Sequence, residues 1–148
     1  MWSGPRNLST ALMRSFENRE DTKVWDEPFY AYYLKETKKN HPLANEIINK
    51  YETNLEKIID LVTAEKDFIY FQKHMSHHII KKIPINWITK GINCFLIRHP
   101  KEVLLSYIQK NDLIDSNDLG YPAQLRLFNY IKTSNKKILV IDAKDLSE

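Results

Sequence analysis

The stretch that decides the fold is Met1-Trp-Ser-Gly-Pro-Arg-Asn-Leu-Ser-Thr-Ala-Leu-Met-Arg-Ser-Phe16. Its pattern is typical of the end of a strand, a tight loop and the start of a helix. Gly4 permits backbone angles that other residues avoid, and Pro5 fixes its own φ. Asn7 is suited to cap the helix. The side chains expected on one face of that helix are Leu8, Leu12 and Phe16.

The predicted helix start is suited to binding an anion. A helix N-terminus has unpaired N–H groups and a partial positive charge. Arg6 precedes the first turn, and Ser9 and Thr10 add two hydroxyls to it. An ordinary capped helix with a solvated arginine remains the alternative at this point. The stretch is not a Walker A loop, because no Gly-Lys-Ser/Thr closes it.

Residues 3–12, Ser-Gly-Pro-Arg-Asn-Leu-Ser-Thr-Ala-Leu, resemble the 5′-phosphosulfate-binding loop of the sulfotransferases that use 3′-phosphoadenosine 5′-phosphosulfate. That family has a P-loop-like α/β fold, and its loop usually reads Pro-Lys/Arg-Ser-Gly-Thr-Thr. Leu8 stands where the family has glycine. The resemblance implies a catalytic role for Arg6 and a nucleotide-binding role for the whole loop. The loop residues concerned are Arg6, Asn7, Leu8, Ser9 and Thr10.

A second segment, Ile97-Arg-His-Pro-Lys-Glu-Val-Leu-Leu-Ser-Tyr107, follows a strand predicted over 92–97. It resembles the 3′-phosphate-binding segment of the same family, which usually reads Val-Arg-Asp-Pro-Arg-Asp-Val-Leu-Val-Ser-Tyr. The resemblance implies that Arg98, as a fork of donors, and Ser106, as a hydroxyl, hold the 3′-phosphate. The helix of this segment is expected to turn four side chains inward. They are Val103, Leu104, Tyr107 and Ile108.

A carboxylate follows the strand predicted over 22–25. Asp26-Glu27-Pro28 reads as a turn in which proline takes the first position of a helix. Ligands bind at the carboxyl edge of open parallel sheets, so Glu27 is a candidate catalytic base. A carboxylate that complements the helix dipole is the alternative.

Gln72-Lys73-His74-Met75-Ser76-His77-His78 follows a strand predicted over 68–71. It is similar to the family segment in which a lysine and a histidine follow a strand and the histidine takes the proton of the acceptor. Lys73 and His74 are the nearest matches, and His77 or His78 are alternatives because the family has one residue between the pair. Three histidines on one face of a helix would suggest a metal site. No cysteine and no clearly placed carboxylate completes the ligand set, so no metal is expected. A surface histidine cluster with no role is a further interpretation.

The other segments predict a parallel sheet with helices on both faces, in three layers, as one domain over residues 1–148. An amphipathic helix is expected over 43–66, a polar loop over 111–120 and a strand over 138–141. A last helix begins at Tyr121-Pro122 and is expected to bury Leu125, Phe128 and Ile131. An aromatic cluster is expected either to line an acceptor pocket or to pack on the sheet. Its members are Phe29, Tyr30, Tyr32 and Tyr33. The chain is expected to be incomplete at both ends.

Composition restricts the partners of the chain. A net charge of +3, with basic residues spread along the 148 residues, does not favour nucleic acid. The single cysteine, Cys94, excludes an internal disulfide and favours the cytoplasm. The longest apolar runs are only a few residues, so no membrane span is expected. The sequence does not indicate an oligomeric state.

These patterns predict an enzyme that transfers a sulfuryl group from 3′-phosphoadenosine 5′-phosphosulfate to a hydroxyl or amine of a small acceptor. One alternative is another nucleotide-binding domain, such as a P-loop kinase. The other is a shortened family member that binds nucleotide without turnover. Neither a metal ion nor a redox cofactor is expected.

Overall fold

The computed structural model describes residues 1–109, 115–134 and 136–146. Within them, five parallel strands form one sheet in the order β2-β3-β1-β4-β5. The strands are β1 (Trp2–Ser3), β2 (Thr22–Asp26), β3 (Ile69–Met75), β4 (Asn93–Ile97) and β5 (Ile138–Asp142). The helices are α1 (Ser9–Glu17), α2 (Tyr30–Thr37), α3 (Ala44–Lys50), α4 (Leu55–Thr63), α5 (Pro100–Ile108) and α6 (Tyr121–Thr133).

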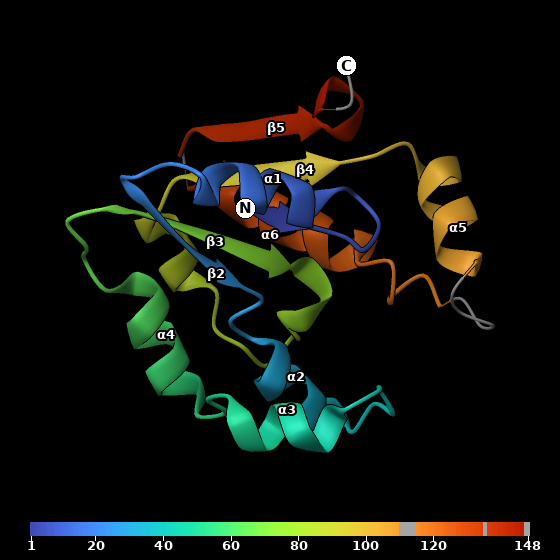
Figure 1. The fold of residues 1–148 in the computed structure, drawn as a ribbon, viewed down its shortest axis with the longest axis horizontal. Coiled ribbons are helices and arrows are strands. Elements are labelled where there is room, and N and C mark those ends of the chain that lie inside the picture. The colour runs from blue at the N-terminus through green and yellow to red at the C-terminus, as the bar shows by residue number, and fades with distance from the viewer. Residues whose placement is uncertain (110–114, 135, 147–148) are drawn as a thin grey trace.

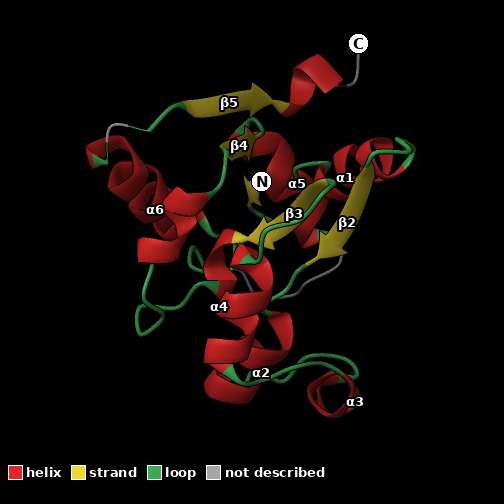
Figure 2. Ribbon diagram, turned by 90° about the vertical axis from the view of Figure 1, so that its left-hand side faces the viewer, coloured by secondary structure: helices red, strands yellow, loops and turns green. Residues whose placement is uncertain are grey.

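Helices cover both faces of the sheet. Figure 1 shows α1 in front of the strands and α6 behind them. The side view in Figure 2 places α4 and α6 on one side of the sheet and α1 on the other. Because parallel strands need crossover connections, this alternation of strands and helices gives a three-layer α/β fold. The predicted fold class, a parallel sheet of P-loop-like architecture, is therefore confirmed.

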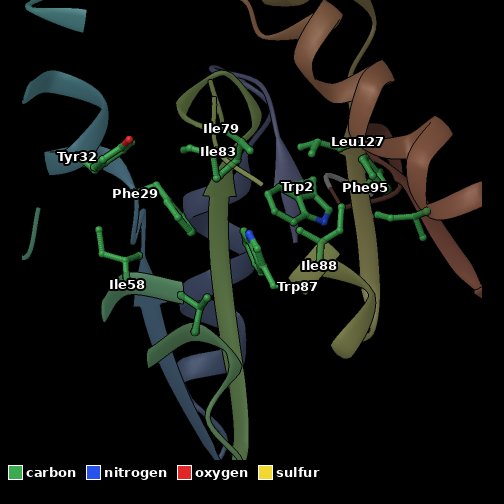
Figure 3. Packing of buried hydrophobic residues seen from close by; sticks show 12 residues of the cluster. Trp2, Phe29, Tyr32, Ile58, Ile79, Ile83, Trp87, Ile88, Phe95 and Leu127 are labelled. Atoms are coloured by element: carbon green, nitrogen blue, oxygen red, sulfur yellow. The ribbon is translucent and has the colours of Figure 1, made fainter. Parts of the chain in front are cut away.

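The core lies on both faces of the central strands, since successive side chains of a strand point to opposite sides. Trp2 of β1 and Phe95 of β4 are paired in register and belong to the larger cluster, with Trp87 and Leu127 (Figure 3). Leu96 faces the other way, into a smaller cluster that includes side chains of α1 and β5. The short strand β1 is thus buried from both sides.

The helix predicted over 43–66 is wrong in one respect, because it is two helices. The chain leaves the helical conformation at Tyr51, and α4 begins again after Asn54. The Asn54 carboxamide oxygen accepts a hydrogen bond from the Lys57 amide at 3.0 Å, which caps α4. The Glu52 carboxylate accepts from the Thr53 and Asn54 amides and stabilises the break.

The predicted cap of α1 is also wrong. Leu8 is the capping residue, in the left-handed conformation with φ of 63°, and its side chain is 38% exposed. The Asn7 side chain instead donates to the Leu96 carbonyl at 3.2 Å. On the inward face of α1, Ser9 and Met13 are buried, and the predicted Leu12 and Phe16 are half-buried against the core and Phe71; only Leu8 departs from the prediction.

Three further predictions of local structure are corrected. Helix α2 begins at Tyr30, two residues beyond Pro28. Helix α5 buries Val103, whereas Leu104 and Ile108 are exposed. Of the residues predicted to be inward in α6, Leu125 is exposed, whereas Ile131 is buried and Phe128 packs against the larger cluster; Gln124 and Leu127 are also buried.

The strand predicted over 68–71 continues to Met75. Lys73 and His74 therefore lie within β3 instead of following it, and Ser76–His78 form a short 3₁₀ helix beyond the strand. Of the polar loop predicted over 111–120, residues 111–114 lie outside the described residues.

Candidate functional site

The carboxyl ends of the parallel strands meet at one edge of the sheet, and the predicted site residues gather there. The loop over 4–8 follows β1, Glu27 follows β2, the segment Ser76–His78 follows β3 and Arg98 follows β4. Gly120 packs between two of these segments. A Cβ atom built on it would lie 3.6 Å from the Gly4 Cα and 3.4 Å from the His77 Nδ1.

The loop after β1 has a defined, strained shape. Arg6 and Leu8 have φ of 64° and 63°, in the left-handed region that favours glycine. A Cβ on Gly4 would lie 2.6 Å from the Leu119 carbonyl oxygen, so only glycine fits there without a shift. Asn7 is 2% exposed and anchors the loop on β4. Backbone N–H groups in such turns curl around a common point and, at a helix start, form an anion-binding concavity.

Arg6, Arg98 and Ser106 lie in direct contact, although they are far apart in the sequence. The Arg6 Nε donates to the Ser106 Oγ at 2.8 Å, and an Arg98 Nη1 donates to the Arg6 carbonyl at 2.9 Å. The Arg98 Nε donates to the Glu102 carboxylate at 2.9 Å. The first turn of α1 adds Ser9 and the exposed Thr10 beside this loop. The two predicted phosphate-binding segments thus form one cationic region.

Lys73 forms a buried ion pair with two carboxylates. Its side chain is 4% exposed, and its Nζ lies 2.6 Å from the Asp26 Oδ1 and 2.7 Å from the Glu27 Oε1. Burial lowers the pKa of the lysine, but the nearby Glu27 and Asp26 charges and their hydrogen bonds outweigh it, so the pKa of Lys73 is raised. Lys73 is therefore a fixed positive charge at neutral pH.

His78 lies on the other side of the Glu27 carboxylate. Its Nδ1 is 3.8 Å from the Glu27 Oε2 and has no hydrogen-bond partner, and its ring stacks between Tyr30 and Tyr33 at centroid distances of 4.9 and 4.7 Å. Burial holds the pKa of His78 well below its usual value, and positive neighbours lower it further. The imidazole is therefore neutral at neutral pH. His77 packs edge-on against Tyr33.

His74 is not brought to this group of residues. Its ring faces the larger core cluster and stacks on Trp2 at 4.5 Å, while its Nε2 lies 3.1 Å from the Gln72 Oε1. Burial holds the pKa of His74 well below its usual value. The geometry therefore separates His74 from Glu27, Lys73 and His78, which lie together.

The comparisons with known proteins agree with this arrangement. A family model described as a sulfotransferase domain matches residues 1–148. The chain belongs to the sulfotransferase domain family. It is 33% identical to branched-chain-amino-acid aminotransferase-like protein 2 of Arabidopsis thaliana and 35% identical to aminotransferase-like protein 1 of the same plant, each over 153 residues. Each match covers 98% of this chain and 26% of the relative.

The sulfotransferase chain thus spans about a quarter of the length of the curated relatives it matches. No solved structure matches it. The names of the relatives describe those longer proteins. They do not say what this part of them does.

Sequence reasoning missed one residue of this candidate site. Asp26 was assigned only to a turn, but it pairs in register with Lys73 and accepts a hydrogen bond from it. The signal that could have identified it is the parallel pairing of β2 with β3, which sets Asp26 beside Lys73.

In the described part of the chain, His, Cys, Asp and Glu side chains form no group of three or more that could hold a metal ion. The histidines do not converge, because His74 faces the core. None of the described helices combines the length and the apolar character needed to cross a bilayer.

Proposed function

We propose that this chain transfers a sulfuryl group from 3′-phosphoadenosine 5′-phosphosulfate to a hydroxyl or amine of a small acceptor. The observation that carries the proposal is the contact between Arg6 and the segment of Arg98 and Ser106. Two guanidinium groups and a hydroxyl at a helix start form a donor set suited to a bisphosphorylated nucleotide. The match to the sulfotransferase domain supports the sulfuryl chemistry.

The loop and the second segment divide the nucleotide between them. Arg6, the first-turn amides of α1, Ser9 and Thr10 hold the 5′-phosphosulfate. Arg98 and Ser106 hold the 3′-phosphate. When bound, the nucleotide supplies the sulfuryl group and leaves as adenosine 3′,5′-bisphosphate. Donors fixed in advance stabilise the negative charge that develops during transfer, and the loss of one such donor typically costs about a hundredfold or more in rate.

Glu27, Lys73 and His78 serve the acceptor. As the acceptor oxygen or nitrogen bonds to sulfur, the bond from sulfur to the bridging phosphate oxygen breaks, and the acceptor proton passes to the Glu27 carboxylate. His78, whose pKa burial holds well below its usual value, stays neutral beside Glu27 and limits how the carboxylate can move. Lys73 holds Glu27 in place and adds positive charge near the transferring group. His74 has no part in this proposal because it faces the core.

The experiment that tests the proposal is calorimetric titration of adenosine 3′,5′-bisphosphate into the purified chain, with adenosine 5′-monophosphate as the control. We expect the bisphosphate to bind more tightly, because Arg98 and Ser106 contact only its second phosphate. Equal affinity for the two nucleotides would overturn the proposal. Transfer of labelled sulfate to any acceptor then separates an active enzyme from a domain that binds without turnover.

A P-loop kinase would instead prefer ATP, and competition between ATP and the bisphosphate tests that alternative. The cytoplasm remains our predicted location. Cys94 is half-buried, and burial raises the pKa of its thiol, which fits an unreactive cysteine in a reducing compartment.

A further inference from the structure

A cavity of about 500 Å³ opens beside Glu27. It lies between the end of β2, the first turn of α2 and the break between α3 and α4. We call it the Glu27 cavity, and its lining residues include Trp25, Asp26, Tyr30, Ile47 and Tyr51, together with Glu52. Its size is in the range of small-molecule sites. Of the predicted aromatic cluster, Tyr30 lines this cavity, whereas Phe29, Tyr32 and Tyr33 are buried in the fold.

The walls of the Glu27 cavity combine flat rings with negative charge. Asp26, Glu27 and Glu52 contribute carboxylates, and no lysine or arginine is among the described residues that line it. Backbone amides hold the pKa of Glu52 below its usual value, so it is ionised at neutral pH. Aromatic faces and carboxylates both attract cations.

The nearby lysines compensate these carboxylates unequally. Lys73 compensates Asp26 and Glu27 from within the protein, where its side chain is 4% exposed. The Lys57 Nζ is 3.9 Å from the Glu52 carboxylate, and its side chain is 69% exposed. Lys50 has its Nζ 5.5 Å from the Tyr51 ring, on the solvent side of the helix. Glu52 is therefore the lining carboxylate whose lysine neighbours, Lys57 and more weakly Lys35, lie at the exposed surface, where a bound cation can replace them.

A buried polar atom without a partner lies behind the same wall. His78 is 4% exposed, its Nδ1 has no hydrogen-bond partner, and it faces Glu27 at 3.8 Å and stacks on Tyr30, two residues that line the cavity. A buried polar atom left without a partner calls for an explanation, and a bound molecule or a water molecule beside Glu27 would supply the missing partner.

We propose that the Glu27 cavity is the acceptor site and that it takes small aromatic molecules carrying a positively charged amine. This rests on the proposed function. A protonated amine has no lone pair with which to attack sulfur, so the accepting group of such a molecule is a separate hydroxyl. The ring packs against Trp25 and Tyr30, the ammonium group faces Glu52, and the hydroxyl faces Glu27.

Three phenols of matched size test the charge preference without any nucleotide. They are tyramine, which is cationic, 4-ethylphenol, which is neutral, and 3-(4-hydroxyphenyl)propionate, which is anionic. The titrations are made at pH 7.5 and followed by Trp fluorescence and calorimetry. Tyramine should bind about tenfold more tightly than 4-ethylphenol, because only its ammonium group can form an ion pair and a cation–π contact with the cavity. The propionate should bind most weakly.

A matched pair of variants locates the binding. Glu52→Gln keeps an oxygen for the Thr53 and Asn54 amides but removes the charge, and it should weaken tyramine about two- to fivefold while leaving 4-ethylphenol unchanged. Glu46→Gln is the control, because Glu46 lines a different cavity beside α3. It should leave tyramine binding unchanged.

Each result decides the proposal. No binding of any phenol at millimolar concentration, equal binding of the three, or equal effects of Glu52→Gln and Glu46→Gln would overturn it. The outcome is distinct from that of the proposed function, because no nucleotide is present. Tyramine binding in a chain that fails to bind adenosine 3′,5′-bisphosphate would keep the amine site and remove the sulfotransferase mechanism.

Discussion

At the scale of single residues, Arg98 contacts two groups, the Arg6 carbonyl and the Glu102 carboxylate. Its bond to the Arg6 carbonyl supports the loop, and we propose that it also binds the 3′-phosphate. We expect Arg98→Ala to weaken adenosine 3′,5′-bisphosphate by about tenfold or more, since hydrogen bonds to charged groups contribute about 1.5–3 kcal/mol. Adenosine 5′-phosphosulfate, which lacks the 3′-phosphate, should lose less affinity, through the loop alone. Calorimetry of both nucleotides measures the difference.

Glu102→Gln is the control for Arg98→Ala. It removes the negative charge that Arg98 contacts at 2.9 Å but leaves the arginine in place. The affinity for the bisphosphate should not fall in this variant. Equal losses of both nucleotides in Arg98→Ala would mean that Arg98 supports the loop and does not bind the 3′-phosphate.

His77 makes the stability of the fold depend on pH. Burial, followed by the charge of Lys39, lowers its pKa from 6.5 to about 4. The unfolded chain therefore binds more protons between pH 6.5 and 4, and the stability is lost as the pH falls through this range. His77 contributes at most about 3 kcal/mol to the free energy of unfolding. The free energy of unfolding, measured with urea at pH 7, 5.5 and 4.5, should fall less steeply with decreasing pH for His77→Gln than for the unchanged chain. Parallel losses would contradict this assignment.

The sequence indicated most of the site residues but not their partners. Arg6 and Arg98 could be expected at one sheet edge, because each follows a strand of a parallel sheet, whereas Ser106 lies within α5 and was indicated only by the resemblance of its segment. The pairing of Lys73 with Asp26 could not, because it depends on the register of β2 against β3. His74 was misplaced because the strand extends four residues beyond its most apolar part.

At the scale of elements, the loop after β1 depends on its close contact with the segment before α6. Gly4→Ala would place a Cβ 2.6 Å from the Leu119 carbonyl oxygen, and the backbone would have to shift. We expect a loss of about 1–3 kcal/mol in the free energy of unfolding, as for other overpacked sites. Nucleotide affinity should fall as well. Chemical denaturation and calorimetry measure the two effects.

Gly91→Ala is the matched control for that substitution, since a Cβ there meets nothing within 4 Å and Gly91 is extended with φ of −109°. Its stability should change by less than about 0.5 kcal/mol. If the two alanine variants were equally stable, the contact with Leu119 would not constrain the loop.

The errors in the predicted helices have a common physical cause. Apolar periodicity continues through 51–54, so it does not reveal the break before α4, which depends on the hydrogen bonds of Glu52 and Asn54. In α6 the buried face includes Gln124, whose amide donates to the Leu96 carbonyl at 3.1 Å. A pattern based on apolar residues alone therefore misses Gln124 and includes the exposed Leu125, although it places Phe128 and Ile131 correctly.

At the scale of the whole molecule, the order of the strands determines which parts are best protected. β1 lies between β3 and β4, whereas β2 and β5 are the edges of the sheet. In β5, Leu139 and Val140 are about half exposed. We expect amide hydrogen exchange to be slowest in β4 and in the part of β3 beside β1, and faster in β5. Mass spectrometry of exchanged peptides checks this order, and slower exchange in β5 than in β4 would contradict it.

The fold class was the most predictable property, because alternating strands and helices allow few arrangements other than a parallel sheet. The order in which the strands pair was less predictable, because it depends on contacts between residues far apart in the sequence. Trp2 meets Phe95 on one side and His74 on the other, and local sequence patterns do not specify such neighbours.

The turn at Arg6 and Leu8 has a consequence for how this protein tolerates change. Both residues adopt a conformation that costs an ordinary residue roughly 1–2 kcal/mol, so the local sequence does not favour the turn. The anchor from Asn7 to the backbone of β4 helps to impose it, together with the bond from Arg98 to the Arg6 carbonyl. A disturbance of β4 is therefore transmitted to the anion-binding loop, even when it occurs far from any ligand.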